Sequence, residues 1–194
     1  MDQVLNKKLL VLDNYDSFTY NLVHLIEKIG HANFEVHRND KISLDEVSKF
    51  DKILLSPGPG LPKDAGIMPE LIKRYSDTRS IFGVCLGLQA IGEAFGAKLK
   101  NLDTVYHGIA TPVKILESNF IFKNCPSNFI VGRYHSWVVD QTDLPSCFKV
   151  TAVDDQNNIM ALSHTSLNVN GVQFHPESVL SEQGETILRN WLCQ

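Results

Sequence analysis

The sequence lacks the features that mark several large classes of protein. No apolar run approaches the ~18 residues of a membrane-spanning helix, so we do not expect a membrane among the partners of this protein. Basic residues are not in excess, because 18 lysines and arginines against 22 aspartates and glutamates give a net charge of -4. Nucleic acid is therefore not expected as a partner. The apolar stretch near the N-terminus is too short for an export signal, so we expect a cytoplasmic protein.

Cysteine is scarce and scattered. The chain has 4 cysteines and no CxxC pair, so we expect no structural zinc site and no bound metal. Without an export signal the thiols are expected to stay reduced, which leaves them available for chemistry. Repeats and low-complexity segments are also missing. The chain, residues 1–194, is therefore predicted to be a single domain.

Strand and helix patterns alternate in the first half of the chain. The predicted strands are residues 8–14, 34–38, 51–56 and 80–85. The predicted helices are residues 17–30, 43–50, 67–75 and 86–95. This order is typical of an α/β fold with a mostly parallel central sheet and helices on both faces. In such folds the chemistry lies at the carboxyl ends of the strands.

The pattern changes from about residue 97 to residue 172. Short β-like runs, separated by proline, asparagine, aspartate and serine, occupy residues 108–116, 129–139, 149–154 and 158–164. We predict a smaller antiparallel addition to the same sheet. A final helix is predicted at residues 184–192.

The stretch GVCLG, residues 83–87, places a cysteine between two glycines directly after an apolar strand. This is the form of a nucleophile turn, in which the glycines let the chain turn tightly and let substrate approach. A helix that begins at Leu86 would put its positive dipole end at Cys85 and favour the thiolate. The alternative is a buried cysteine, with glycines for close contact between helix and sheet. Gln89 lies one turn further on the same helix face, where it can contact a substrate.

The stretch SPGPG, residues 56–60, follows the third predicted strand. Its prolines stiffen the loop and have no N–H group, whereas Gly58 and Gly60 leave their N–H groups sterically open. Such a loop suits an oxyanion hole that the N–H of Leu86 completes. The alternative is a rigid surface turn.

A thiol nucleophile requires a base and an acceptor behind that base. Of the 7 histidines, His175 is the first candidate, because it ends an apolar run and precedes Pro176 and Glu177. Residues i and i+2 of an extended chain project to the same side, so Glu177 can reach the imidazole. His135 is the second candidate and lacks a nearby carboxylate. The alternative is an exposed His-Pro turn.

Together these motifs resemble those of the class I glutamine amidotransferases. SPGPG, GVCLGLQ, YHSWVV and GVQFHPES occur in the family's order, and the similarity runs through essentially the whole chain. LDNYDSFTYNLV, residues 12–23, is similar to the small subunits that serve chorismate-using synthases. These synthases make anthranilate for tryptophan biosynthesis or 4-amino-4-deoxychorismate for folate biosynthesis, and some small subunits serve both synthases. The anthranilate role is our first expectation.

The resemblance implies roles for particular residues. Cys85 would be the nucleophile, His175 the base and Glu177 its orienter. The oxyanion donors and the glutamine site would be formed by Gly58, Pro59, Gly60, Leu86, Gln89, Ser136 and Trp137. Two positions depart from the usual pattern, since the family commonly has histidine where this chain has Leu88 and leucine where it has Trp137.

The resemblance also implies a reaction and a partner. L-glutamine would be hydrolysed through a cysteine thioester, and ammonia would pass to a docked large subunit that uses chorismate and Mg²⁺. No cofactor is expected in this chain. We expect the loops after Asn14, Ser56 and Cys85 to contribute to the interface, with Tyr15 and Leu61 within it.

Two other functions stay open. A stand-alone cysteine hydrolase of γ-glutamyl compounds would turn over fully without a partner. In a binding or regulatory module with a vestigial site, the cysteine would be alkylated and glutamine would not protect it. The intact set of Cys85, His175 and Glu177 argues against the second of these.

Overall fold

The computed structural model describes residues 7–194, so residues 1–6, which begin the stretch examined for an export signal, lie outside it. The strands are β1 (Leu9–Asp13), β2 (Phe34–Arg38), β3 (Lys52–Leu55), β4 (Ser80–Val84), β5 (Leu99–Asn101), β6 (Ile109–Ile115), β7 (Asn128–Arg133), β8 (Trp137–Val139), β9 (Phe148–Val153), β10 (Ile159–His164) and β11 (Val169–Val172). The helices are α1 (Thr19–Ile29), α2 (Leu44–Val47), α3 (Met68–Tyr75), α4 (Leu86–Ala94) and α5 (Gly184–Leu192), with short 3-10 turns at Pro62–Asp64 and Phe120–Phe122. Within residues 7–194, no helix combines the length and the apolar character needed to cross a membrane.

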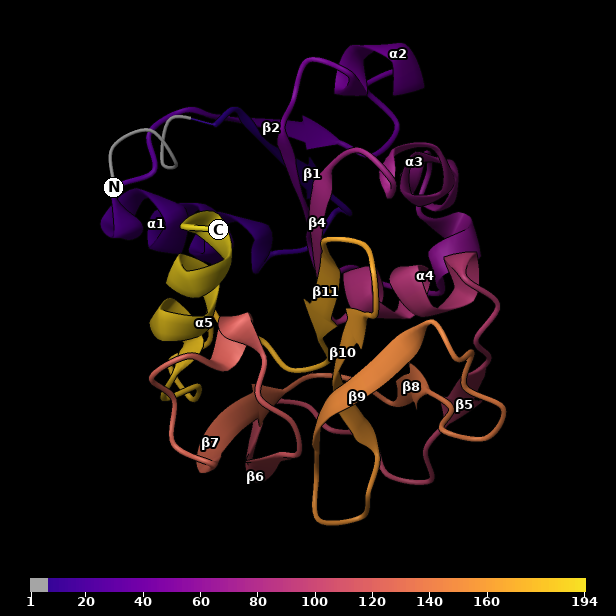
Figure 1. Cartoon of the computed structure of the whole chain (residues 1–194), viewed down its shortest axis with the longest axis vertical. Helices are drawn as coiled ribbons and strands as arrows, with labels where there is room; N and C mark the ends of the chain where they lie inside the picture. Colours follow the sequence, from indigo (N-terminus) through magenta and orange to yellow (C-terminus); the bar gives the residue numbers. More distant parts are fainter. Residues whose placement is uncertain (1–6) are drawn as a thin grey trace.

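A 9-stranded sheet forms the centre of the fold, in the order β2-β1-β3-β4-β11-β10-β9-β6-β7 (Figure 1). The strands β2, β1, β3, β4 and β11 are parallel to one another. From β11 onward each strand is antiparallel to its neighbour. The prediction of a mostly parallel sheet with an antiparallel addition is therefore confirmed.

The parallel part of the sheet is covered on both faces, as predicted. Leu9 and Val11 of β1 belong to the apolar layer that also contains α1 and α5, whereas Leu10 and Leu12 belong to the layer of α3 and α4. Figure 1 shows α1 beside α5 on one side of the sheet and α3 beside α4 on the other. Because successive side chains of a strand point to opposite faces, a strand buried on both faces is apolar throughout.

The predicted β-like run at residues 129–139 is in fact two strands. β7 remains in the main sheet, whereas β8 leaves it and pairs antiparallel with β5. The three residues between them, Tyr134, His135 and Ser136, form a wall of the pocket described below. The sequence pattern did not predict β5, because LKN is short and mostly exposed and its partner strand lies far along the chain.

Candidate active site

Cys85 lies in the turn between β4 and α4 and has a backbone conformation that L-residues rarely adopt, with φ 53 and ψ -102. Such a conformation costs ~1–3 kcal/mol and persists only where its surroundings hold it. The N–H of Cys85 donates to the carbonyl of Val172 at 2.8 Å, and its carbonyl accepts from the N–H of Gln89 at 3.1 Å. The sheet and the helix thus hold the turn from both sides. The strand-turn-helix arrangement is the one predicted, with the sulfur at the positive end of α4.

The two glycines that flank Cys85 stand where there is no room for a side chain. A Cβ atom on Gly83 would collide with the backbone of Gly87, and one on Gly87 would lie 2.5 Å from the carbonyl oxygen of Leu55. Both glycines therefore allow α4 to approach the sheet closely. The expectation that they leave room for substrate is wrong, and the alternative interpretation holds for this part of the motif.

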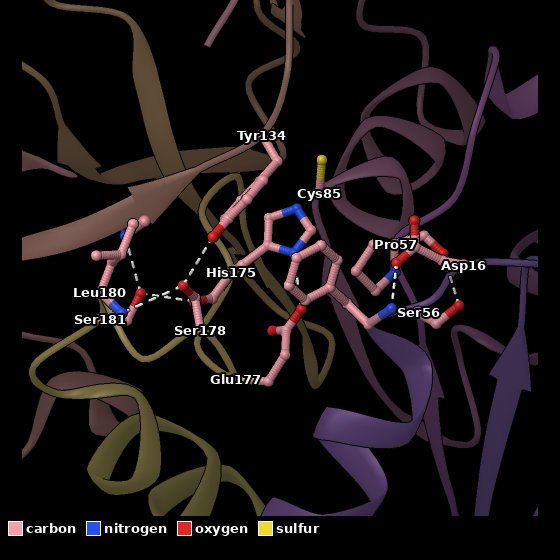
Figure 2. Close-up of polar contacts among 12 residues, drawn as sticks. Asp16, Ser56, Pro57, Cys85, Tyr134, His175, Glu177, Ser178, Leu180 and Ser181 are labelled. Carbon is pink, nitrogen blue, oxygen red and sulfur yellow. Dashed lines mark hydrogen bonds and ion pairs between the residues drawn. The ribbon is translucent and has the colours of Figure 1, made fainter. Parts of the chain in front are cut away.

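The loop after β3 is joined to the loop after β1 by buried hydrogen bonds. Asn14 donates from its backbone N–H to Ser56 Oγ at 2.9 Å and from Nδ2 to the Ser56 carbonyl at 2.8 Å. Ser56 Oγ in turn donates to the carbonyl of Pro57 at 2.7 Å, a contact drawn in Figure 2. A Cβ atom on Gly58 would lie 2.6 Å from Leu86 Cδ2, so only glycine fits there. The two residues predicted to form the oxyanion hole, Gly58 and Leu86, are therefore in direct contact.

A pocket of about 370 Å³ opens beside Cys85, which is within the usual range for small-molecule sites. Its lining includes all of the predicted glutamine-site residues: Gly58, Pro59, Gly60, Leu86, Gln89, Ser136 and Trp137. Sequence reasoning missed Val105, Tyr106, His107 and Tyr134, which also line it. Val105, Tyr106 and His107 lie on an irregular segment without a period or motif, and Tyr134 begins the motif YHSWVV but was given no role.

His175 and Glu177 meet behind the sulfur. The imidazole Nδ1 and Glu177 Oε1 are 2.7 Å apart, and both side chains are almost fully buried, with 2% and 0% exposure. The predicted contact between His175 and Glu177 is therefore present, but it is made across a turn at residues 176–177 and not along an extended chain. The other ring nitrogen, Nε2, lies on the side of the ring toward Cys85 (Figure 2).

The pKa of His175 is raised to about 10. Burial is the largest single influence and lowers the pKa, but hydrogen bonds and charge from Cys85 and Glu177 act in the opposite direction and together outweigh it. The imidazole is therefore protonated at neutral pH. A protonated imidazole beside the sulfur favours the thiolate, which is the nucleophilic form of cysteine.

Comparison with known proteins agrees with this geometry. Residues 10–194 match the family model described as "Glutamine amidotransferase class-I". The chain belongs to the class I glutamine amidotransferase family. This amidotransferase is 43% identical over 186 residues to aminodeoxychorismate synthase component 2 of Escherichia coli (strain K12), covering 95% of this chain and 98% of the relative. It is 42% identical over 193 residues to anthranilate synthase component 2 of Pseudomonas aeruginosa, covering 96% and 95%.

The fold of this amidotransferase is also similar to that of a solved structure. A crystal structure of a glutamine amidotransferase from Thermotoga maritima superposes with a TM-score of 0.78 at 15% sequence identity, covering 96% of each chain. At this level of identity the likeness concerns the fold alone.

Two aromatic side chains hold the imidazole of the amidotransferase in place. The rings of Phe18 and Tyr134 lie 5.2 Å and 4.8 Å from the ring of His175, and 4.8 Å from each other. The Tyr134 hydroxyl is 3.2 Å from Ser178 Oγ (Figure 2). His175 is therefore restrained by ring packing as well as by Glu177. Neither aromatic residue was singled out from the sequence.

His135, the second candidate base, is not free to accept a proton. Its Nε2 accepts from Arg133 Nε at 3.1 Å, so its Nδ1 carries the hydrogen and donates to the Trp137 carbonyl at 3.1 Å. Burial and the charge of Arg133 lower the pKa of His135 to about 3, so the ring is neutral. Arg133 is itself fully buried and pairs with Asp154 at 2.9 Å. We therefore assign His135 to the pocket wall.

Gln89 lies at the pocket as predicted, but its amide N–H groups are used within the protein. Nε2 donates to the Trp137 carbonyl at 2.9 Å and to Gln173 Oε1 at 3.3 Å. Leu88 points into the core and is fully buried, in agreement with its helical spacing.

Proposed function

We propose that this amidotransferase is the glutaminase subunit of anthranilate synthase, which hydrolyses L-glutamine and delivers ammonia to a chorismate-using large subunit. The observation that carries the proposal is the alignment of Cys85, His175 and Glu177 at the edge of a pocket of about 370 Å³. The family and the names of its relatives supply the substrate and the partner.

In the first half of the reaction, the Cys85 thiolate attacks the carbonyl carbon of the glutamine side chain. The N–H groups of Gly58 and Leu86 stabilise the negative charge on the carbonyl oxygen, and losing one such donor typically costs ~10²–10³ in rate. The His175 imidazolium gives its proton to the leaving nitrogen. Ammonia departs and a γ-glutamyl thioester remains on the sulfur.

In the second half, water enters and neutral His175 takes its proton, so that hydroxide attacks the thioester carbonyl. The tetrahedral adduct collapses, glutamate leaves and the thiolate is regenerated beside the imidazolium. Glu177 stabilises the charged ring in both halves and keeps Nε2 directed toward the sulfur. Phe18 and Tyr134 restrict the ring to this orientation.

The released ammonia requires a sheltered route, because free ammonia in neutral water largely becomes unreactive ammonium. Exposed apolar side chains around the site provide a surface for the subunit that receives it. Val105 lines the pocket and is 71% exposed, and Val179, on the loop after β11, is 100% exposed. Tyr15 is 47% exposed and lines a neighbouring hollow that shares Pro59 and Leu86 with the pocket. The Mg²⁺ and chorismate sites are proposed to lie on the large subunit.

The same chemistry serving 4-amino-4-deoxychorismate synthase, or both synthases, is the second candidate. It is supported by the relative of that name at 43% identity, against 42% for the anthranilate relative. A stand-alone hydrolase of γ-glutamyl compounds is a more distant alternative.

Glutamine hydrolysis by the purified chain, alone and with each candidate chorismate-using subunit from the same genome, tests the proposal. We expect low activity alone and strong stimulation by one subunit or by both, which also names the pathway. Cys85→Ser is the control and should abolish the stimulated activity. Equal activity with and without either subunit would instead support the stand-alone hydrolase.

Substitutions around the pocket mouth test the interface. Tyr15→Ala, Leu61→Asp and Val179→Asp are expected to weaken association with the large subunit, at least one of them about tenfold, because a minority of interface residues each contribute more than ~1 kcal/mol. Dissociation constants come from titrating the stimulation of glutaminase activity. Leu116→Asp is the matched control. Leu116 is 47% exposed and follows the C-terminal end of β6, whereas the other end of β6 pairs with Arg133. Unchanged affinity in all three variants would place the interface elsewhere.

A further inference from the structure

Gln173 is a buried polar residue to which the mechanism above gives no role. It lies between β11 and His175, with an exposure of 0%, and its backbone N–H donates to the Met160 carbonyl at 2.9 Å. Gln173 and His175 lie two residues apart on the bent segment that follows β11. Both reach Cys85, which means that one segment brings an amide and an imidazole to the sulfur.

The amide contacts the reacting atom directly. Gln173 Nε2 donates to Cys85 Sγ at 3.5 Å, within the range of N–H···S hydrogen bonds. Cys85 is only 6% exposed, so water does little to solvate a thiolate at this position. A buried charge is costly unless hydrogen bonds replace the lost water, and bonds to a charged partner are stronger than bonds between neutral groups.

The surrounding hydrogen bonds determine which end of the amide faces the sulfur. Gln89 Nε2 donates to Gln173 Oε1 at 3.3 Å and to the Trp137 carbonyl at 2.9 Å. An NH₂ group only donates, so the group of Gln173 that faces Gln89 must be its oxygen. The NH₂ group of Gln173 is thereby turned toward Cys85.

A longer network supports this orientation. The Trp137 carbonyl also accepts from His135 Nδ1, whose tautomer is set by the Arg133 Nε–H on the opposite nitrogen. Arg133 is held by Asp154. The network thus connects the buried ion pair of Arg133 and Asp154 to the sulfur, and its last member, the Gln173 NH₂ group, donates to the sulfur.

We propose that Gln173 is a further catalytic residue, whose amide N–H stabilises the Cys85 thiolate, and that Gln89 is the positioning residue that orients this amide. The inference rests on the proposed function, because a thiolate matters only if Cys85 is the nucleophile. The contact acts on the free enzyme and again when the thioester breaks down and the sulfur regains its negative charge.

Alkylation of Cys85 by iodoacetamide measures the thiolate without glutamine or a partner. Gln173→Glu keeps an oxygen for Gln89 to donate to, replaces the NH₂ group that faces the sulfur and adds a negative charge that also disfavours the thiolate. We expect its alkylation rate at about pH 6.5 to fall about 10-fold to 100-fold, because bonds to charged groups contribute ~1.5–3 kcal/mol. At about pH 9.5 the rate should approach that of the parent, since the thiol ionises there without help.

Two further variants keep the test decisive. Gln173→Met has a similar length, lacks the N–H and adds no charge, so a pH-selective loss in this variant is due to the lost hydrogen bond alone. Gln141→Met is the matched control, because Gln141 is exposed on a loop away from the pocket. Apart from the carboxyl group that Gln173→Glu adds, the titratable side chains that line the pocket or pair behind the sulfur are the same in parent and variants: Tyr106, His107, Tyr134, His135, His175 and Glu177.

The outcomes separate the two proposals. Alkylation rates within about twofold of the parent at both pH values would overturn the role of Gln173, and so would an equal loss at both values, which indicates a structural role. A pH-selective loss supports the role. If that loss occurs while no synthase subunit stimulates glutamine hydrolysis, only the reaction assignment fails.

Discussion

Replacing His175 with alanine is expected to lower glutamine hydrolysis at least ~10⁴-fold in the presence of the large subunit. The variant loses the proton donor to departing ammonia, the base for water and the positive charge that favours the thiolate. Because the pKa of His175 is about 10, that charge is present throughout the neutral range in the parent. The quantity to measure is kcat/KM for glutamine with saturating partner.

The control for this prediction is His24→Ala, since His24 is exposed on α1. It should match the parent in both activity and thermal stability. Alkylation of Cys85 near pH 7 is expected to slow in the His175 variant, because the thiolate loses its cationic neighbour. Activity within about tenfold of the parent would contradict the assignment of His175 as the general acid and base.

Replacing Asp154 with alanine is expected to lower the free energy of unfolding by about 3–5 kcal/mol. The pair between Arg133 and Asp154 has 0% exposure on both sides, so the variant leaves a positive charge buried without its partner. Asp154 also accepts hydrogen bonds from the backbone N–H groups of Gln156 and Asn158, and these are lost as well. Urea unfolding measures the loss, and thermal unfolding should show a drop of about 2–4 °C per kcal/mol.

Asp45→Ala is the matched control, because Asp45 pairs with Arg74 at the surface with exposures of 84% and 50%. Exposed pairs contribute ~1 kcal/mol or less, so this variant should unfold almost like the parent. Equal destabilisation by the two substitutions would show that burial of Arg133 does not govern the effect. The Asp154 variant is also expected to lose activity, since Arg133 orients His135 and, through it, the Trp137 carbonyl.

Local signals account for the parts of the fold that were predictable. Apolar runs and helical spacing predicted the alternating elements of the first half. The contact between His175 and Glu177 was predicted from their spacing of two residues, but a turn at residues 176–177 brings them together and not an extended chain. Gln173 lies two residues before His175 on a segment that bends after β11, and its contact with the sulfur was not predicted. A glutamine within an apolar run is typical of a strand, so Gln173 was interpreted as a strand residue.

Long-range contacts account for what was missed. Gln89 bonds to residues 48 and 84 positions away, and no local pattern identifies such partners. The pocket wall from Tyr134 to Ser136 resembles strand in its composition and departs from strand because β8 pairs with β5. The flanking glycines of Cys85 were assigned to substrate access, since tight turns and close packing of helix on sheet select the same residue.

The position of β11 between β4 and β10 has a consequence for synthesis of the chain. Cys85 and Gln173 are 88 residues apart, and the triad is completed only by the segment that follows β11. A growing polypeptide on the ribosome therefore carries its thiol long before it carries the amide, the imidazole or the carboxylate. On the proposed mechanism, we therefore expect an unfinished chain not to hydrolyse glutamine.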